Sequence, residues 1–97
     1  METTLSIFTQ ISLRIIKEQE AIIGPLAWSE AAKVDGLSVS KDLGQASVVG
    51  DPKTVINALV ERYEKLFGKL SREICREAVT DLTADIPSDE IPATLKQ

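Results

Sequence analysis

The sequence predicts an α+β fold that is mostly helical, with about four helices and a short central two-stranded β-hairpin. Apolar residues recur at three- and four-residue steps over residues 52–67 and again over 4–23, which is the spacing of an amphipathic helix. Apolar and polar residues alternate over 37–40, and a second short segment over 45–49 follows a turn-like sequence, which is typical of a hairpin. These observations together predict helices packed on a small sheet.

The segment over 52–67 is the strongest helix prediction. Asp51 precedes it and can accept a hydrogen bond from an N–H of the first turn, while Pro52 has the φ of a first helical residue. Gly68 follows as a residue suited to ending a helix. The apolar side of this helix comprises Val55, Ile56, Leu59, Val60, Tyr63, Leu66 and Phe67. We expect the other elements to pack on it.

Residues 4–23 form the second predicted helix. Because β-branched residues are numerous here, a strand over 5–16 is an alternative, although polar and apolar residues alternate poorly in that segment. The Gly24-Pro25 dipeptide then either precedes a second short helix over 26–34 or kinks one long helix.

Residues 71–85 are predicted to form a further helix, with apolar residues at four-residue steps: Leu70, Ile74, Ala78 and Leu82. The apolar series also passes through Gly68 without losing its helical phase, so a single helix from 52 to about 85 is an alternative. We favour a break, because Gly inside a helix costs about 1 kcal/mol relative to Ala.

Two Ile-Pro dipeptides, Ile86-Pro87 and Ile91-Pro92, follow the last helix. Proline disfavours helix in the residue before it, so this segment is expected to be extended or irregular. Its apolar residues either hold it on the domain or leave it loose as a terminus. We therefore expect a compact helix–hairpin–helix domain over 1–86 and an extended, Pro-containing C-terminal tail over 87–97.

The composition describes a small acidic protein. Its 97 residues suffice for one domain, and 43% hydrophobic with 27% charged residues is typical of a folded chain. A net charge of -4 argues against a general nucleic-acid binder. One cysteine provides no disulfide framework, and no segment has the ~18 consecutive apolar residues that span a membrane. We expect a cytoplasmic protein without a membrane partner.

The sequence offers little catalytic chemistry. It has no histidine, which excludes His-dependent catalysis and the commonest transition-metal ligand. Cys75 alone cannot form a cysteine-rich zinc site, and we expect it to be buried, with a reactive thiol beside Arg72 and Arg76 as the alternative. An S-x-x-K order at 38–41 and the Lys53-Thr54 pair each lack the rest of their motif. We expect no catalytic residue, metal or cofactor.

Two groups of residues are candidates for binding. The candidate interface residues are Phe8, Ile15, Trp28, Tyr63 and Phe67. They belong to apolar faces that look wide for one small monomer, so we expect a homodimer or a complex with another protein. For Trp28 we favour a core or half-core position over an interface anchor. The candidate anion-binding residues form a basic stripe: Arg62, Lys65, Lys69, Arg72 and Arg76. This stripe requires a helix that continues through Gly68, and we favour coverage of its charges by intramolecular ion pairs over anion binding.

The sequence thus favours a small non-enzymatic protein–protein interaction or regulatory module that acts as a homodimer or as an assembly subunit. The alternative is an anion- or nucleic-acid-associated regulator that uses the basic stripe. An enzyme that uses carboxylates, Tyr63 or Cys75 is a third hypothesis.

Overall fold

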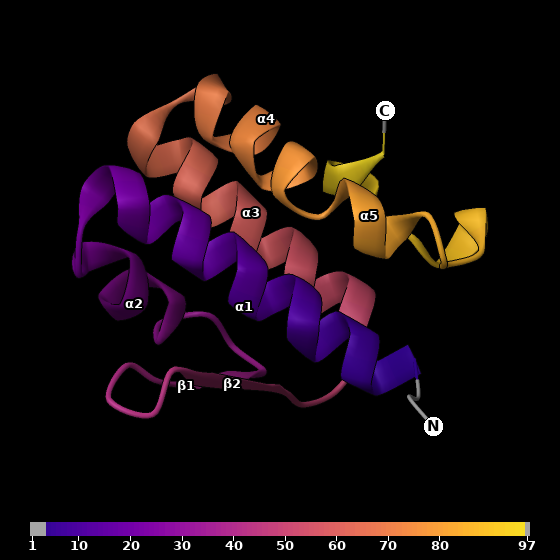
Figure 1. Cartoon of the computed structure of the whole chain (residues 1–97), viewed down its shortest axis with the longest axis horizontal. Coiled ribbons are helices and arrows are strands. Elements are labelled where there is room, and N and C mark those ends of the chain that lie inside the picture. Colours follow the sequence, from indigo (N-terminus) through magenta and orange to yellow (C-terminus); the bar gives the residue numbers. More distant parts are fainter. Residues whose placement is uncertain (1–3, 97) are drawn as a thin grey trace.

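The computed structural model describes residues 4–96 of the chain. For residues 4–6 only the backbone is described. It has the predicted mostly helical α+β architecture. Three long helices form the body, and a short helix and a hairpin cover one side of it (Figure 1). The elements in chain order are α1 Thr4–Ile23, α2 Leu26–Ala31, β1 Leu37–Ser40, β2 Gln45–Val48, α3 Pro52–Phe67, α4 Lys69–Ala78, α5 Thr80–Thr83, and the single-turn 3-10 helices η1 Ser88–Glu90 and η2 Ala93–Leu95.

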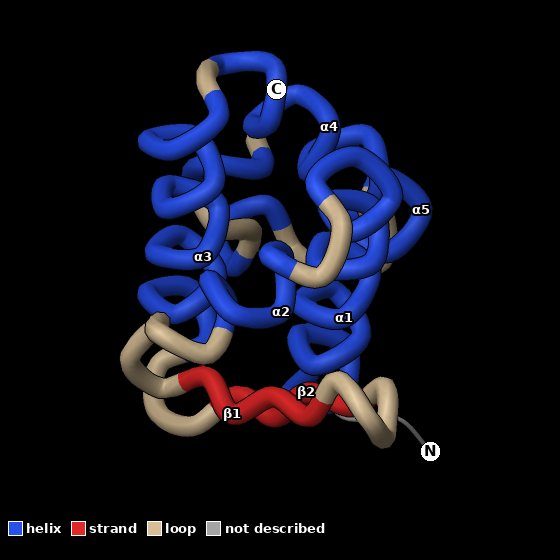
Figure 2. Tube along the Cα trace, turned by 90° about the vertical axis from the view of Figure 1, so that its left-hand side faces the viewer, coloured by secondary structure: helices blue, strands red, loops and turns tan. Residues whose placement is uncertain are grey.

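The hairpin and α1 lie where the sequence predicts them. β1 and β2 are antiparallel, with Leu37 opposite Val48 and Ser40 opposite Gln45, and a four-residue turn joins them. The buried side chains of the hairpin face α1, and Figure 2 shows the two strands crossing below the helices. Since a lone hairpin is marginally stable, this packing is what holds it. After α1, Gly24 has a φ of 73° and α2 is a separate short helix, three residues shorter than expected.

Helix α3 begins as predicted. The Thr54 hydroxyl and backbone N–H both donate to the Asp51 carboxylate and hold the pKa of Asp51 below its usual value. Pro52 is the first helical residue. The residues of α3 that reach the core are Val55, Ile56, Leu59, Val60 and Tyr63. Leu66 and Phe67, the last two members of the predicted apolar side, are exposed instead.

Gly68 ends α3, so the favoured break is present, and the alternative of a single helix from 52 to about 85 is wrong. Its φ of 94° and ψ of 176° lie in a region that is essentially restricted to glycine. The Gly68 N–H still donates to the Glu64 carbonyl, and α4 then starts at Lys69 and runs back along α3 (Figure 1). The helix predicted over 71–85 thus starts two residues earlier, with Ser71 buried in its first turn.

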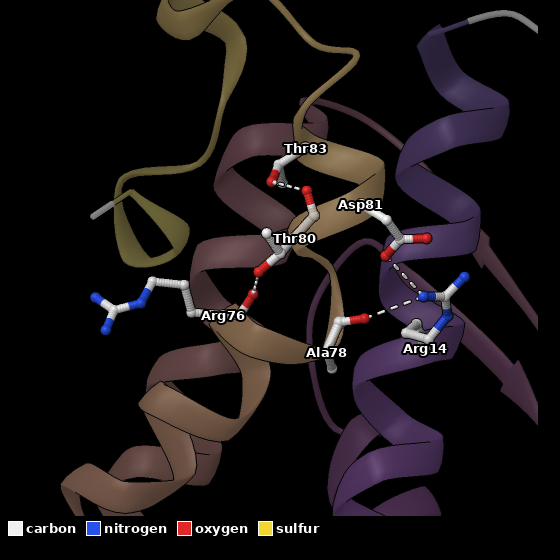
Figure 3. Close-up of polar contacts among 6 residues, drawn as sticks. All are labelled: Arg14, Arg76, Ala78, Thr80, Asp81 and Thr83. Atoms are coloured by element: carbon white, nitrogen blue, oxygen red, sulfur yellow. Dashed lines mark hydrogen bonds and ion pairs between the residues drawn. The ribbon is translucent and has the colours of Figure 1, made fainter.

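The same predicted helix also ends early, since α4 stops at Ala78 and α5 is a separate turn. Val79 leaves helical geometry, with φ −117° and ψ 11°. Arg14 Nη1 on α1 donates to the Ala78 carbonyl at 3.1 Å and to Asp81 Oδ1 at 3.0 Å, as Figure 3 shows. The guanidinium therefore satisfies a terminal carbonyl of α4 that a continuous helix would have paired internally.

The C-terminal segment packs on α3 and α4. The Thr94 hydroxyl and N–H both donate to the Asn57 side-chain oxygen, at 2.7 and 3.0 Å. Pro92 and Leu95 are buried, and Ile91 packs against the core. Residues 88–95 are thereby fixed on the body of the protein by both polar and apolar contacts.

Replacing Gly68 with Ala tests the reversal between α3 and α4. A Cβ at this position would meet no atom within 4 Å, so the expected loss comes from backbone strain alone. We expect Gly68→Ala to lower the free energy of unfolding by about 1–3 kcal/mol in urea denaturation. Glu61→Ala, an exposed change on α3, should alter it by less than about 0.5 kcal/mol. Equal effects of the two substitutions would contradict the strained turn.

Candidate functional site

Four of the five candidate interface residues lie inside the core. Phe8, Ile15, Trp28 and Tyr63 are buried, whereas Phe67 is exposed at the end of α3. The Tyr63 hydroxyl donates to the Ala27 carbonyl at 2.7 Å, and burial raises the pKa of Tyr63. These four side chains are occupied by packing within one chain, so a surface for a second chain has to be sought elsewhere.

Two buried contacts bring the two helix–helix connections to the same end of the molecule. The Tyr63–Ala27 hydrogen bond joins the last turns of α3 to the start of α2. Gln19 Nε2, on the last turns of α1, donates to the Ser71 carbonyl at 3.2 Å and to Cys75 Sγ at 3.4 Å on α4. The α1–α2 and α3–α4 turns therefore both lie at the left-hand end of the molecule in Figure 1.

Large apolar side chains are exposed at this end. We call the group the apolar end; it comprises Ile22, Leu26, Leu66, Phe67 and Leu70. Ile22 is 58% exposed and Leu70 is 69% exposed. Exposed apolar groups of this size, when they gather at one place, are typical of interaction sites. Sequence periodicity did not predict this site, because it assigned Leu66 and Leu70 to apolar helix sides that were expected to pack in the core.

A shallow groove of about 590 Å³ extends from the apolar end between α1 and α4. Ile22, Ile74 and Ala78 give it an apolar lining, and Glu18 and Glu77 give it negative charge. At the far side of the groove Arg14 pairs with Asp81, both exposed to solvent (Figure 3). The α1 side of the apolar end is thus bordered by an acidic groove.

The basic stripe is divided because it requires a helix through Gly68. Three of its five cations are in ion pairs: Arg62 with Glu30 at 2.8 Å, Arg72 with Glu64 at 3.6 Å, and Arg76 with Glu73. Lys65 and Lys69 are exposed on either side of Gly68. The stripe is therefore replaced by separate groups, of which Lys65 and Lys69 border the apolar end.

Cys75 has the features of a structural thiol. It is fully buried on α4, and desolvation raises its pKa to about 11. A thiol with such a pKa is almost entirely protonated at neutral pH, and the thiolate is the reactive form. Within residues 4–96, no group of three or more metal-ligating side chains converges on one point.

Comparison of the chain with protein-family models, with curated proteins and with solved structures gives no significant match. Among the helices that the structure describes, none combines the length and the apolar character needed to cross a bilayer.

Glu30 links α2 to α3, and the contribution of its carboxylate to stability is expected to depend on pH. Its carboxylate accepts hydrogen bonds from Lys33 at 3.2 Å and from Arg62 at 2.8 Å, and these two contacts lower its pKa from 4.5. A carboxylate whose pKa is lowered on folding stabilises the fold above its unfolded pKa, and this contribution is lost as pH falls through the folded pKa.

We expect Glu30→Gln to destabilise the protein at pH 7 and to differ less from the wild type at about pH 3, because the contribution of the Glu30 carboxylate is lost as pH falls from its unfolded pKa through its lowered folded pKa. Urea denaturation at both pH values measures this difference. Glu61→Gln, an exposed change on α3, serves as the control and should have a small effect at either pH. A Glu30→Gln defect of the same size at both pH values would show that charge is not its cause.

Proposed function

We propose that this chain is a small non-enzymatic protein–protein interaction module that forms a homodimer through its apolar end. The observation that carries the proposal is the exposure of five large apolar side chains at one end of a small helical body. Water contact with these groups is unfavourable, and burial against a second copy removes it. The proposal places the protein in the cytoplasm, in keeping with one cysteine and no disulfide framework.

Charges around the apolar end support a second copy as the partner. The α1 side carries Glu18 and Glu20 with Lys17, which leaves it net negative. The α3–α4 side carries Lys65 and Lys69, which makes it positive. In a twofold dimer the same patch serves both subunits, so the acidic side of one subunit faces the basic side of the other.

The size of the chain supports the same proposal. A 97-residue domain with four aromatic residues depends on an aliphatic core of modest size. A dimer interface extends that core across the apolar ends of two subunits, which is a common way for small domains to gain stability. A larger assembly built from such dimers contains the same contact between apolar ends within each dimer.

The alternative, an anion- or nucleic-acid-associated regulator that uses the basic stripe, stays a prediction. Ion pairs at Arg62, Arg72 and Arg76 reduce the charge available to such a partner. Reversal of Arg62, Lys69 and Arg76 to Glu tests it, because loss of nucleic-acid binding would support it and unchanged behaviour would oppose it.

Leu70 and Leu43 form a matched pair for testing the dimer. Leu70 is 69% exposed at the apolar end, and Leu43 is 70% exposed in the hairpin turn. Light scattering over a dilution series should give twice the 10.6 kDa monomer mass at high concentration. We expect Leu70→Glu to weaken association by about tenfold or more and Leu43→Glu to leave it unchanged.

A wild-type mass of 10.6 kDa at every concentration would contradict the homodimer. Association that is unchanged in Leu70→Glu, or that is weakened only in Leu43→Glu, would place the interface elsewhere. Circular dichroism of each variant separates a lost interface from a lost fold.

A further inference from the structure

A second cavity lies at the other end of α4, away from the apolar end. It has a volume of about 370 Å³ and is bounded by the end of α4, by α5 and by the C-terminal segment. Figure 1 shows these elements side by side at the right of the molecule. The volume is at the small end of the range that ligand pockets occupy, so it suits a small molecule and not a polymer.

The cavity has two cations and an apolar wall. Arg76 of α4 and Lys96 at the end of the described chain contribute the positive charge, and no carboxylate is among the lining residues. Ala84, Ile91 and Leu95 contribute the apolar wall. Arg76 also pairs with Glu73, which is outside the lining, so these two cations and one carboxylate leave a net positive charge that favours a negatively charged ligand.

The walls are held in place before any ligand arrives. The Thr94–Asn57 hydrogen bonds and the burial of Leu95 fix the C-terminal segment against α3 and α4. Arg76 has a side chain only 29% exposed, and its Nη2 donates to Glu73. Figure 3 shows the Arg76 side chain extending toward the C-terminal segment, on the opposite side of α5 from Arg14. A fixed cation beside a fixed apolar wall lowers the entropy cost of binding.

Two of the three hydroxyl groups in the lining, those of Thr80 and Thr83, already donate within the chain, which leaves the Ser88 hydroxyl and the cations as donors to a ligand. Thr80 Oγ1 donates to the Arg76 carbonyl at 3.1 Å, and Thr83 Oγ1 donates to the Thr80 carbonyl at 3.2 Å (Figure 3). Both hydroxyl protons are thus engaged within the helix. Arg76 has further N–H groups besides the one that contacts Glu73, and these suit the two oxygens of a carboxylate.

From this arrangement we propose that the cavity between α4, α5 and the C-terminal segment binds a small aliphatic carboxylate. The carboxylate contacts Arg76 and Lys96, and the aliphatic part packs on Ile91 and Leu95. An aliphatic carboxylate is favoured over inorganic phosphate because only the carboxylate has an apolar part that can pack on Ile91 and Leu95. This site is independent of the proposed dimer, since it lies at the other end of α4.

Titration of the full ¹⁵N-labelled chain with sodium hexanoate, followed by NMR, tests the proposal. We expect saturable shifts at the amides of Arg76, Ala84, Leu95 and Lys96, with a Kd below about 10 mM. Hexanamide, which has the same chain without the charge, should bind at least about tenfold more weakly, and so should inorganic phosphate.

Variants separate the cavity from general charge. The double variant Arg76→Gln with Lys96→Gln should weaken hexanoate binding by about tenfold or more, while Lys69→Gln at the apolar end should leave it unchanged. Arg76→Lys with Lys96 intact, which keeps the charge, should retain binding within about tenfold. Failure of hexanoate to saturate the shifts would overturn the proposal. Equal binding of hexanamide, tighter binding of phosphate, or an unaffected double variant would also overturn it.

Discussion

The turn at Gly68 is the constraint on which the arrangement of the helices depends. Its φ of 94° is open to glycine and costly for other residues, and it turns α4 back along α3. Once the two helices lie side by side, α1 packs against both and the aliphatic core closes between them. The same turn leaves Leu66, Phe67 and Leu70 in solvent, because residues at a tight reversal have no neighbouring helix to cover them. The packing of the helices and the exposure of Leu66, Phe67 and Leu70 therefore have one origin.

Polar contacts set the register of this aliphatic body. An aliphatic core tolerates sliding and repacking better than it specifies one alignment. Gln19 against α4 and Tyr63 against α2 each fix one pair of helices at the apolar end, and Arg14 fixes α1 at the end of α4. A buried polar group that loses its partner costs more than its hydrogen bond is worth, so the buried contacts of Gln19 and Tyr63 oppose alternative alignments. The result is a defined surface at each end of α4.

Local rules predict much of the fold. The hairpin follows from alternation and a turn, and the start of α3 follows from Asp51 and Pro52. The early end of α4 could not be predicted from its periodicity, because Arg14, 64 residues away in sequence, accounts for it by donating to Ala78. The exposure of the apolar side chains at the apolar end could not be predicted from the sequence for a related reason. Periodicity gives the side of a helix on which a residue lies but not whether a neighbour reaches it, so Leu70 and Ile74 look alike in sequence.

Two copies of the chain are proposed to meet through their apolar ends. Isotope-filtered NMR on a mixture of labelled and unlabelled chains measures contacts between subunits and excludes those within one. We expect intermolecular contacts from the methyl groups of Ile22 and Leu26 to those of Leu66 and Leu70. Intermolecular contacts confined to the hairpin, or none at concentrations where the mass is that of a dimer, would contradict the account.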